Sequence, residues 1–302
     1  TNTSLVEKDV LGSGSTGRSQ AICRMHYSNP ITSTLAWESL KTLTNFSEIV
    51  GGRSGFIKTG YMVIVDQTNG HGLEQNISMQ QALRIDCQLI SRKEAAQIEP
   101  MISKYYGELM AWEPRSGYAD SYQVTASFAN AAKIMGAEII LRNPVENIIP
   151  STNGQYSVIT AMGTIETPLI IVAAGPWSKS LLMSIGIDIP LTTVRHQVAS
   201  ITRPTDLIPT HPSVGDAIHN FSFRPEGGGL TLVGFGEEDA MVDQYHQGVD
   251  IDSVNQIMPG LIGRMPHMED AYFRDADLVR NAFNVGEDPL DEDGAYKKWF
   301  NG

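Results

Sequence analysis

The sequence predicts an α/β chain (α+β, two domains) in which a parallel α/β domain is interleaved with an antiparallel β-sheet domain. Two observations lead to this prediction. Residues 118–174 switch between helix and strand patterns and end in an apolar run without polar alternation, which is typical of a parallel sheet. From residue 187 onward, short β patterns are joined by glycine-containing turns. A length of 302 residues also suits two domains better than one small core.

Composition excludes several classes of protein. With 41% hydrophobic and 19% charged residues the chain is globular. A net charge of −12 argues against nucleic-acid binding, because no basic excess neutralises phosphates. The two cysteines suit a reducing compartment, so we expect a cytoplasmic protein, or a mitochondrial matrix protein in a eukaryote. We expect no membrane span, because no apolar run reaches about 18 residues, and no metal site, because the histidines are scattered.

The first hundred residues carry alternating strand and helix patterns. Pro30 precedes an apolar stripe that predicts a helix, and Ser91 with Glu94 forms a capping box at the start of another. The predicted elements, in order, are a strand at 3–7, a helix at 31–46, a strand at 60–66, a helix at 75–85, a strand at 87–90 and a helix from 91 to about 100.

The elements after residue 118 are predicted in the same way, from capping residues and from the spacing of apolar residues. Asp120 and Ser121 offer a cap for a helix whose apolar residues recur at helical spacing up to Gly136. The run at 169–174 predicts a strand buried on both faces, and Pro176 can begin a helix. The other predicted elements are a strand at 137–141, a hairpin at 156–161 and 164–166, strands at 194–202, 219–224 and 229–235 around a turn at 225–228, and a helix at 250–262.

The first candidate site is Glu7 with the Gly/Ser loop that follows it. An apolar strand ending in an acid, then a glycine-rich loop, is typical of the second strand of a dinucleotide-binding unit, where the acid takes the ribose hydroxyls. A flexible surface loop after an edge strand is an equally good interpretation. In such units a G-x-G-x-x-G turn precedes the acid by about 20 residues. Because Glu7 is the seventh residue, we expect that the first βα unit is absent from this chain.

Other polar and aromatic candidates are weaker. Arg24, beside Tyr27, could hold a carboxylate in a bidentate fork, although a surface ion pair is the commoner role. His196 lies inside a predicted strand, where a lone histidine is more often structural than catalytic. Phe223 and Phe235 have strand spacing and suit a core or a pocket wall.

Four segments, taken in this order, resemble the FAD-dependent D-amino-acid oxidase superfamily, in particular its sarcosine oxidase, dimethylglycine dehydrogenase and glycine oxidase branch. They are LVEKDVLGSGSTGRSQAICRMHYS from residue 5, SGYADSYQVTASFANAAKIMGAEI from 116, IETPLIIVAAGPWS from 165 and FSFRPEGGGLTLVGF from 221. The resemblance implies an incomplete Rossmann-like FAD-binding domain at 1–47 and 116–186, lacking the first βα unit and the C-terminal flavin segment. It implies a substrate-binding domain with an antiparallel sheet at 48–115 and 187–302.

The resemblance also assigns roles to residues. Arg24 and His196 would be catalytic, and Arg24 would bind the substrate carboxylate together with the neighbouring substrate-binding residues Tyr27, Gln197, Phe223 and Phe235. The FAD-binding residues would be Glu7, Lys8, Gly14, Ser15, Thr16, Gly17, Arg18, Ser19, Val145, Ala174, Gly175 and Trp177. Arg18 stands where dimethylglycine dehydrogenases carry a flavin-linking histidine, so we expect noncovalent FAD. Because the G-x-G-x-x-G turn is missing, we also expect weak or no FAD binding by this chain alone.

The activity implied is oxidation of the C–N bond of a small N-methylated or secondary amino acid, with hydride transfer to FAD N5 followed by imine hydrolysis. The partners implied are the amino-acid substrate and an electron acceptor, either oxygen or an electron-transfer protein. Two alternatives stay open. The chain could be a non-catalytic scaffold or assembly subunit of the same fold, or a partial chain without activity of its own.

Overall fold

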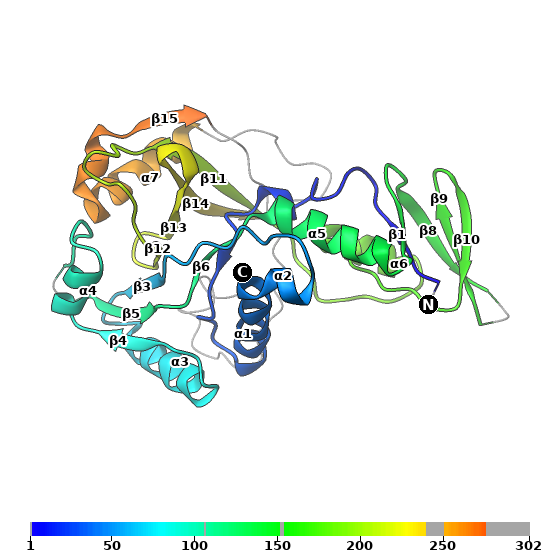
Figure 1. The fold of residues 1–302 in the computed structure, drawn as a ribbon, viewed down its shortest axis with the longest axis horizontal. Helices are drawn as coiled ribbons and strands as arrows, with labels where there is room; N and C mark the ends of the chain where they lie inside the picture. Colours follow the sequence, from blue (N-terminus) through cyan, green and yellow to red (C-terminus); the bar gives the residue numbers. More distant parts are fainter. Residues whose placement is uncertain (1, 106, 152–153, 240–250, 276–302) are drawn as a thin grey trace.

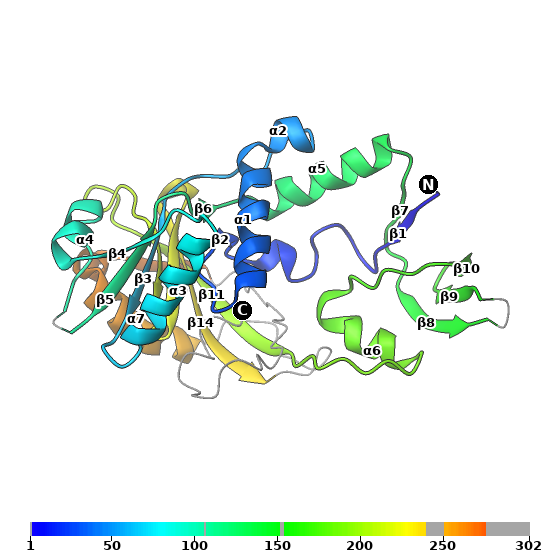
Figure 2. The same cartoon turned by 90° about the horizontal axis from the view of Figure 1, so that it is seen from below.

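The fold is dominated by an eight-stranded mixed sheet. The structure, a computed structural model, describes residues 2–105, 107–151, 154–239 and 251–275 (Figures 1 and 2). The strand order is β15-β11-β14-β13-β12-β3-β5-β4, and all neighbours are antiparallel except the parallel pair β12 and β3. The strands are β3 (Tyr61–Val65), β4 (Gln88–Ile90), β5 (Leu109–Glu113), β11 (Val194–Thr202), β12 (Ser213–Asp216), β13 (Phe221–Glu226), β14 (Leu230–Asp239) and β15 (Tyr272–Asp275).

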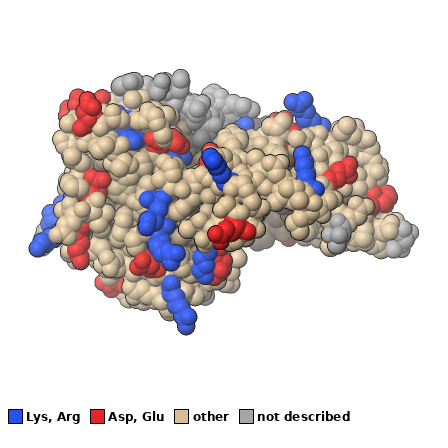
Figure 3. Space-filling model, viewed as in Figure 1, with Lys and Arg blue, Asp and Glu red and all other residues tan. Residues whose placement is uncertain are grey.

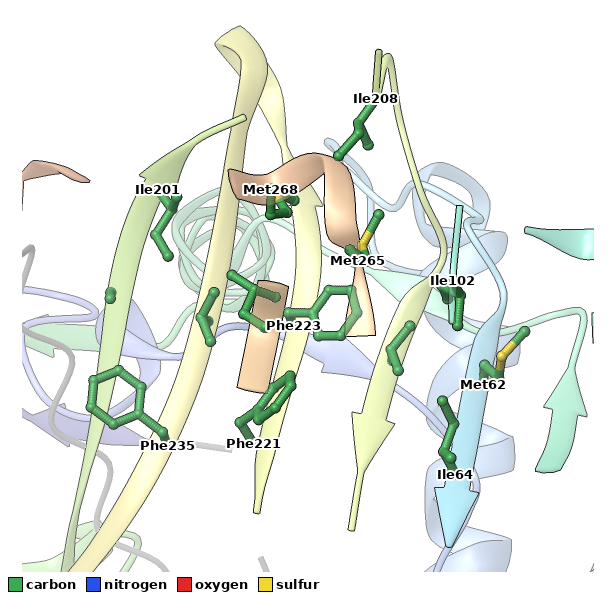
Figure 4. Packing of buried hydrophobic residues seen from close by; sticks show 14 of the residues in the cluster. Met62, Ile64, Ile102, Ile201, Ile208, Phe221, Phe223, Phe235, Met265 and Met268 are labelled. Atoms are coloured by element: carbon green, nitrogen blue, oxygen red, sulfur yellow. The ribbon is translucent and has the colours of Figure 1, made fainter. Parts of the chain in front are cut away.

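Both faces of this sheet are covered, and β3 shows why its sequence has no polar alternation. Met62 and Ile64 belong to one core cluster, which also contains Phe221, Phe223 and Met265 (Figure 4). Tyr61, Val63 and Val65 belong to the second cluster, together with apolar residues of α1 and α3. A strand with a core on each face buries every residue, and all five residues of β3 are buried.

The helices begin and end largely where their caps predict. Ser91 and Glu94 form the predicted capping box, and Asp120 accepts hydrogen bonds from the backbone N–H groups of Tyr122 and Gln123. One prediction is wrong: the helix expected at 75–85 begins five residues earlier, because Asp66 accepts from Asn69 and turns the chain directly into it. The helices are α1 (Pro30–Thr44), α2 (Phe46–Ile49), α3 (Gly70–Ala82), α4 (Arg92–Ile98), α5 (Ser121–Ile134), α6 (Ser178–Met183) and α7 (Ile251–Arg264).

Among the described residues, three small sheets lie outside the large one. β1 (Ser4–Val6) pairs in parallel with β7 (Glu138–Ile140), and β8 (Val145–Pro150), β9 (Tyr156–Thr160) and β10 (Gly163–Thr167) form an antiparallel sheet. β2 (Ile22–Cys23) pairs with β6 (Gly117–Tyr118). Figure 1 shows β1 and β8–β10 at one end of an elongated molecule, with the large sheet at the other and α5 between them. The domain division at residues 47, 116 and 186 stays a prediction.

The predicted buried strand at 169–174 is wrong. These residues form no strand, and Leu169 and Ile171 are 73% and 84% exposed. The predicted apolar face of α5 is only partly covered: Val124 is half-buried, whereas Phe128 is 48% exposed and the C-cap residue Met135 is 85% exposed. An apolar run becomes a buried strand only where neighbouring strands and helices cover it. Among the described residues, the parallel sheet of β1 and β7 has two strands and supplies no such cover.

The predicted turn at 225–228 is also shifted. Pro225 and Glu226 continue β13, and the reversal is made by the short helical turn Gly227–Gly229. Gly228 and Gly229 both have positive φ, which glycine adopts without strain. The tail from residue 287 that the sequence marks as weakly patterned lies outside the described residues. On the face drawn in Figure 3, described acidic and basic side chains are interspersed rather than gathered in one patch.

Candidate functional site

Glu7 lies at the carboxyl end of the parallel strand pair. Its N–H donates to the carbonyl of Ile140 at 2.9 Å, and its own carbonyl accepts from Asn143 at 3.0 Å. The side-chain Oε1 accepts from the backbone N–H of Asp9 at 2.9 Å, which holds the carboxylate at the turn. In open α/β sheets ligands bind at the carboxyl ends of the strands. Val145 begins β8 two residues after Asn143 and so lies on the segment that leaves this edge.

The Gly/Ser loop packs against the first turn of α5. A Cβ added to Gly17 would stand 2.2 Å from the carbonyl oxygen of Gly12 and 2.8 Å from the ring of Tyr122, so no larger residue fits there without a shift. Gly17 also donates its N–H to the Gly12 carbonyl at 3.0 Å. The short helical turn Thr16–Arg18 follows, and the Ser19 hydroxyl accepts from the backbone of Ala21. Ser15 immediately precedes that turn.

The segment at 174–177 meets this loop. The Lys8 ammonium lies 3.3 Å from the centroid of the Trp177 ring, and a Cβ on Gly14 would lie 3.9 Å from the same ring. Ala174 precedes Gly175, which has φ +55° and open space where a Cβ would stand. The structure therefore brings together two sets of predicted cofactor residues, 7–19 and 174–177, that are far apart in the sequence.

This arrangement fits the adenosine and phosphate part of FAD. It offers an acid at a strand end, a loop of small and hydroxyl side chains, and the open backbone at Gly175. These are the groups that bind ribose hydroxyls and phosphates in dinucleotide sites. Glu7, the loop residues 14–19 and the segment at 174–177 are the residues that would hold the cofactor.

Arg24 lies on the segment between β2 and α1. Its guanidinium carbon is 4.4 Å from the centroid of the Tyr27 ring and 5.7 Å from that of Tyr61, and Nη1 donates to the carbonyl of His26. Burial by itself lowers the pKa of Arg24, but the charges of Tyr27, Tyr61 and Glu113 outweigh burial, so its pKa is raised. Arg24 is therefore a fixed positive charge with aromatic rings beside it.

Glu113, which the sequence analysis missed, lies beneath this segment. It is fully buried, and its Oε2 accepts from the Met25 N–H at 3.0 Å and from the Ser116 hydroxyl at 2.7 Å. Burial raises its pKa. Nearby, burial lowers the pKa of His26 to about 3, so His26 is neutral at pH 7 and its Nδ1 accepts from Gln80 at 3.3 Å. The sequence does contain a signal for this residue, because Glu113 is the one charged residue of the otherwise apolar strand β5.

His196 lies on the face of the large sheet that meets the Gly/Ser loop. A Cβ on Gly234 would stand 2.8 Å from His196 Nε2 and 2.4 Å from Gln20 Oε1, so the two side chains meet above that glycine. The Ser222 hydroxyl donates to Gln20 at 2.7 Å, which ties the loop to β13. Burial lowers the pKa of His196 to about 4. A bulge between Arg195 and Gln197 interrupts the expected alternation.

The remaining predicted substrate residues lie on the opposite face. Phe223 is fully buried and Phe235 is 3% exposed, and both belong to one core cluster, in which Phe223 lies beside Met265 (Figure 4). Gln197, 2% exposed, pairs with Phe235 in the strand register. The burial of Phe223 and Phe235 in this cluster favours a role in the core for both side chains over a role in the wall of a pocket. Arg24, in contrast, belongs to the segment 19–27, and His196 lies on the sheet face that this segment meets through Gln20.

Arg224 is a second residue that the sequence analysis missed. It is buried on the loop-facing side of β13, donates to the Gln20 carbonyl, and lies 4.1 Å from the centroid of the Tyr118 ring. Side chains of consecutive strand residues point to opposite faces of a sheet. Phe221 and Phe223 point into the core, so Arg224, the next residue of β13, points to the opposite face. Arg224 therefore supports the contact between the loop and the sheet.

Comparison with known proteins gives the family. The FAD dependent oxidoreductase family matches residues 1–295. Mitochondrial dimethylglycine dehydrogenase of Mus musculus is 25% identical over 253 residues, which cover 78% of this chain and 28% of that protein. Mitochondrial sarcosine dehydrogenase of Homo sapiens is 24% identical and covers 95% of this chain and 33% of that protein. The chain thus spans about a third of the length of these relatives.

Solved structures share the fold. L-proline dehydrogenase from P. horikoshii superposes with a TM-score of 0.82 at 21% identity, covering 94% of this chain and 75% of that one. Glycine oxidase from Geobacillus kaustophilus gives a TM-score of 0.78 at 18% identity, covering 93% and 76%. Within the described residues, no helix is both long and apolar enough to cross a membrane. The match over nearly the whole sequence shows that the chain belongs to the FAD-dependent oxidoreductase family.

Proposed function

We propose that this chain is the FAD- and substrate-binding part of an enzyme that oxidises the C–N bond of a small N-methylated or secondary amino acid. The observation that carries the proposal is Arg24, a guanidinium held 4.4 Å from the Tyr27 ring within a member of a flavoenzyme family. A guanidinium pairs with a carboxylate through two parallel N–H···O bonds, which fixes the orientation as well as the position of an amino acid.

The residues around Arg24 make a carboxylate the expected ligand. The Tyr27 and Tyr61 rings lie beside the guanidinium, and charge pairs gain strength where water is excluded. Because the pKa of Arg24 is raised, it keeps its charge at every physiological pH. Arg24 therefore binds the substrate carboxylate and directs the amine end of the molecule away from itself.

His196 acts at the amine end. Its pKa of about 4 makes the imidazole neutral at pH 7 and too weak a base to keep a proton taken from an ammonium group. A neutral imidazole adds no positive charge, so an uncharged amine is tolerated, and a ring nitrogen can accept a hydrogen bond from it. FAD, when bound, supplies the acceptor for the hydride that leaves the α- or N-methyl carbon.

Relatives support an N-methylated substrate. The names of the dimethylglycine and sarcosine dehydrogenases describe oxidation of such amino acids, and the solved structures include an L-proline dehydrogenase, named for a secondary amino acid. All three substrates named are small and carry one carboxylate beside a substituted amine. A single arginine such as Arg24 suits that shared feature.

The test is anaerobic bleaching of the flavin in the FAD-loaded protein that contains this chain. Sarcosine, dimethylglycine, D-proline and glycine are mixed separately with the protein, and the visible flavin band is followed. We expect bleaching by N-methylated or secondary amino acids, with glycine slower. A protein that binds FAD but is bleached by none of the four would be a scaffold of this fold rather than an amino-acid oxidoreductase.

A further inference from the structure

Glu113 is a buried carboxyl group that the proposed function does not use. It ends β5, is fully buried, and lies directly opposite Tyr61 in the register of β3 and β5. Burying a carboxyl group is unfavourable unless its surroundings compensate for the lost hydration. Its retention at the base of the Arg24 segment therefore needs an explanation.

The two oxygens of Glu113 have different surroundings. Oε2 accepts from the backbone N–H of Met25 and from the Ser116 hydroxyl. Oε1 lies 3.8 Å from His26 Nδ1 and has no hydrogen-bond donor among the described residues. His26 is no ionic partner at neutral pH, because Nδ1 already accepts from Gln80 and burial keeps the ring uncharged. Burial raises the pKa of Glu113, and the hydrogen bonds from Met25 and Ser116 and the positive charge of Arg24 act in the opposite direction.

Geometry links Glu113 to Arg24 in two further ways. Met25, whose N–H Glu113 binds, is the residue next to Arg24, so the carboxylate fixes the backbone from which the guanidinium projects. Tyr61, the direct cross-strand neighbour of Glu113, is one of the two rings beside that guanidinium. The Tyr27 N–H closes a tight turn onto the Met25 carbonyl at 2.9 Å, which carries the same constraint to the second ring.

We propose that Glu113 is a positioning residue that holds Arg24 for carboxylate recognition, through its hydrogen bond to Met25 and its place opposite Tyr61 in the strand register. This inference rests on the proposed function of Arg24. It predicts that changes at Glu113 weaken recognition of the carboxylate specifically, although Glu113 itself touches no substrate.

The experiment measures binding without turnover, by calorimetry on the FAD-loaded protein that contains this chain. Methoxyacetate has the shape of sarcosine with an ether in place of the amine, so it has no C–N bond to oxidise. 2-Methoxyethanol is its partner without a carboxylate. The readout is the ratio of the two affinities, which a general loss of packing would not change selectively.

Four variants separate the outcomes. Arg24→Ala is expected to abolish the preference for methoxyacetate. Glu113→Gln, which keeps the shape and replaces the carboxyl acceptor of the Met25 N–H by a weaker amide acceptor, is expected to lower it about tenfold. Ser116→Ala removes one support of the same carboxylate and is expected to lower the preference about threefold, a smaller loss of the same kind. Glu99→Gln is the matched control, since Glu99 is also buried but accepts its bond from nearby Met101.

The results distinguish this inference from the proposed function. If Arg24→Ala leaves the preference unchanged, the proposed function fails. If Arg24→Ala removes it while Glu113→Gln and Ser116→Ala behave like Glu99→Gln, the positioning role of Glu113 is overturned and Arg24 stands. If Glu113→Gln does not fold, Ser116→Ala decides alone, and an unchanged preference in that variant overturns the role.

Discussion

The ammonium of Lys8 lies 3.3 Å from the centre of the Trp177 ring, which joins the end of β1 to the segment after residue 174. A contact between a lysine and the face of a tryptophan stabilises by about 0.5–1 kcal/mol at an exposed site. It also joins the two sets of predicted FAD-binding residues, 7–19 and 174–177.

We expect Lys8→Met and Trp177→Leu each to lower the fraction of protein that retains FAD after dialysis. Because the two side chains contact each other, the double variant should lose less than the sum of the single losses. The measurement is the FAD dissociation constant of the four proteins in a double-mutant cycle. Additive losses would show that the contact has no part in holding the cofactor.

Gly17 and Gly14 give a matched pair within the Gly/Ser loop. In Gly17→Ala the added methyl would meet the Gly12 carbonyl and the Tyr122 ring, whereas in Gly14→Ala the nearest atom is 3.9 Å away. Overpacking of this kind costs about 1–3 kcal/mol. We expect Gly17→Ala to lower the free energy of unfolding of the flavin-free protein by that amount, and Gly14→Ala to leave it nearly unchanged. Equal effects in denaturant titration would mean that the loop does not pack on Tyr122.

Buried neutral histidines predict acid sensitivity. Burial lowers the pKa of His26 and His211 to about 3 and that of His196 to about 4. Between these values and the ordinary pKa near 6.5, the unfolded chain binds protons that the folded chain does not. Each histidine therefore contributes stability that is complete above about pH 6.5 and is lost as the pH falls, with a slope of up to about 1.4 kcal/mol per pH unit.

His211→Asn isolates one of these contributions. His211 donates from Nδ1 to the Pro212 carbonyl at 2.8 Å, so Nε2 accepts from the Thr231 hydroxyl at 2.9 Å and the ring is neutral. Asparagine can keep the first bond but does not titrate. The free energy of unfolding of the variant, measured between pH 4 and pH 6.5, should fall less steeply with acid than that of the unmodified chain. Parallel curves would contradict the lowered pKa of His211.

Arg264 anchors α7 to the sheet through a buried ionic network. Its Nε donates to Asp216 at 2.7 Å, and its two terminal nitrogens donate to Glu108 at 3.0 and 2.8 Å. Removing one partner of such a network leaves uncompensated charges and costs about 3–5 kcal/mol. Arg264→Met should therefore destabilise the protein by that amount.

A surface pair provides the control for Arg264. Lys41 and Glu38 lie 2.6 Å apart on the outside of α1, with both side chains largely exposed. Exposed pairs contribute about 0–1 kcal/mol, so Lys41→Met should change the unfolding free energy by no more than that. If both variants lose the same stability, the Arg264 network is not the buried anchor described above.

Local signals predicted more of this protein than long-range ones. The capping box at Ser91 and the cap at Asp120 depend on neighbouring residues, and both were confirmed. The strand at 169–174 was wrong because an apolar pattern does not reveal whether partner strands are present beside it. In the candidate site, Glu113 binds Met25 across 88 positions and Gln20 binds Ser222 across 202, and no local spacing encodes either contact.

The most direct test of the account is the kinetics of Arg24→Ala in the FAD-loaded protein that contains this chain. Loss of a charged hydrogen bond to the substrate carboxylate removes about 1.5–3 kcal/mol of binding, which corresponds to tenfold or more in KM. The measurement is KM for the amino acid that bleaches the flavin fastest, with Arg53→Ala as a control at an exposed arginine. We predict a KM raised at least tenfold in Arg24→Ala alone. A KM equal to that of the unmodified protein would contradict the assignment of Arg24 as the residue that binds the substrate.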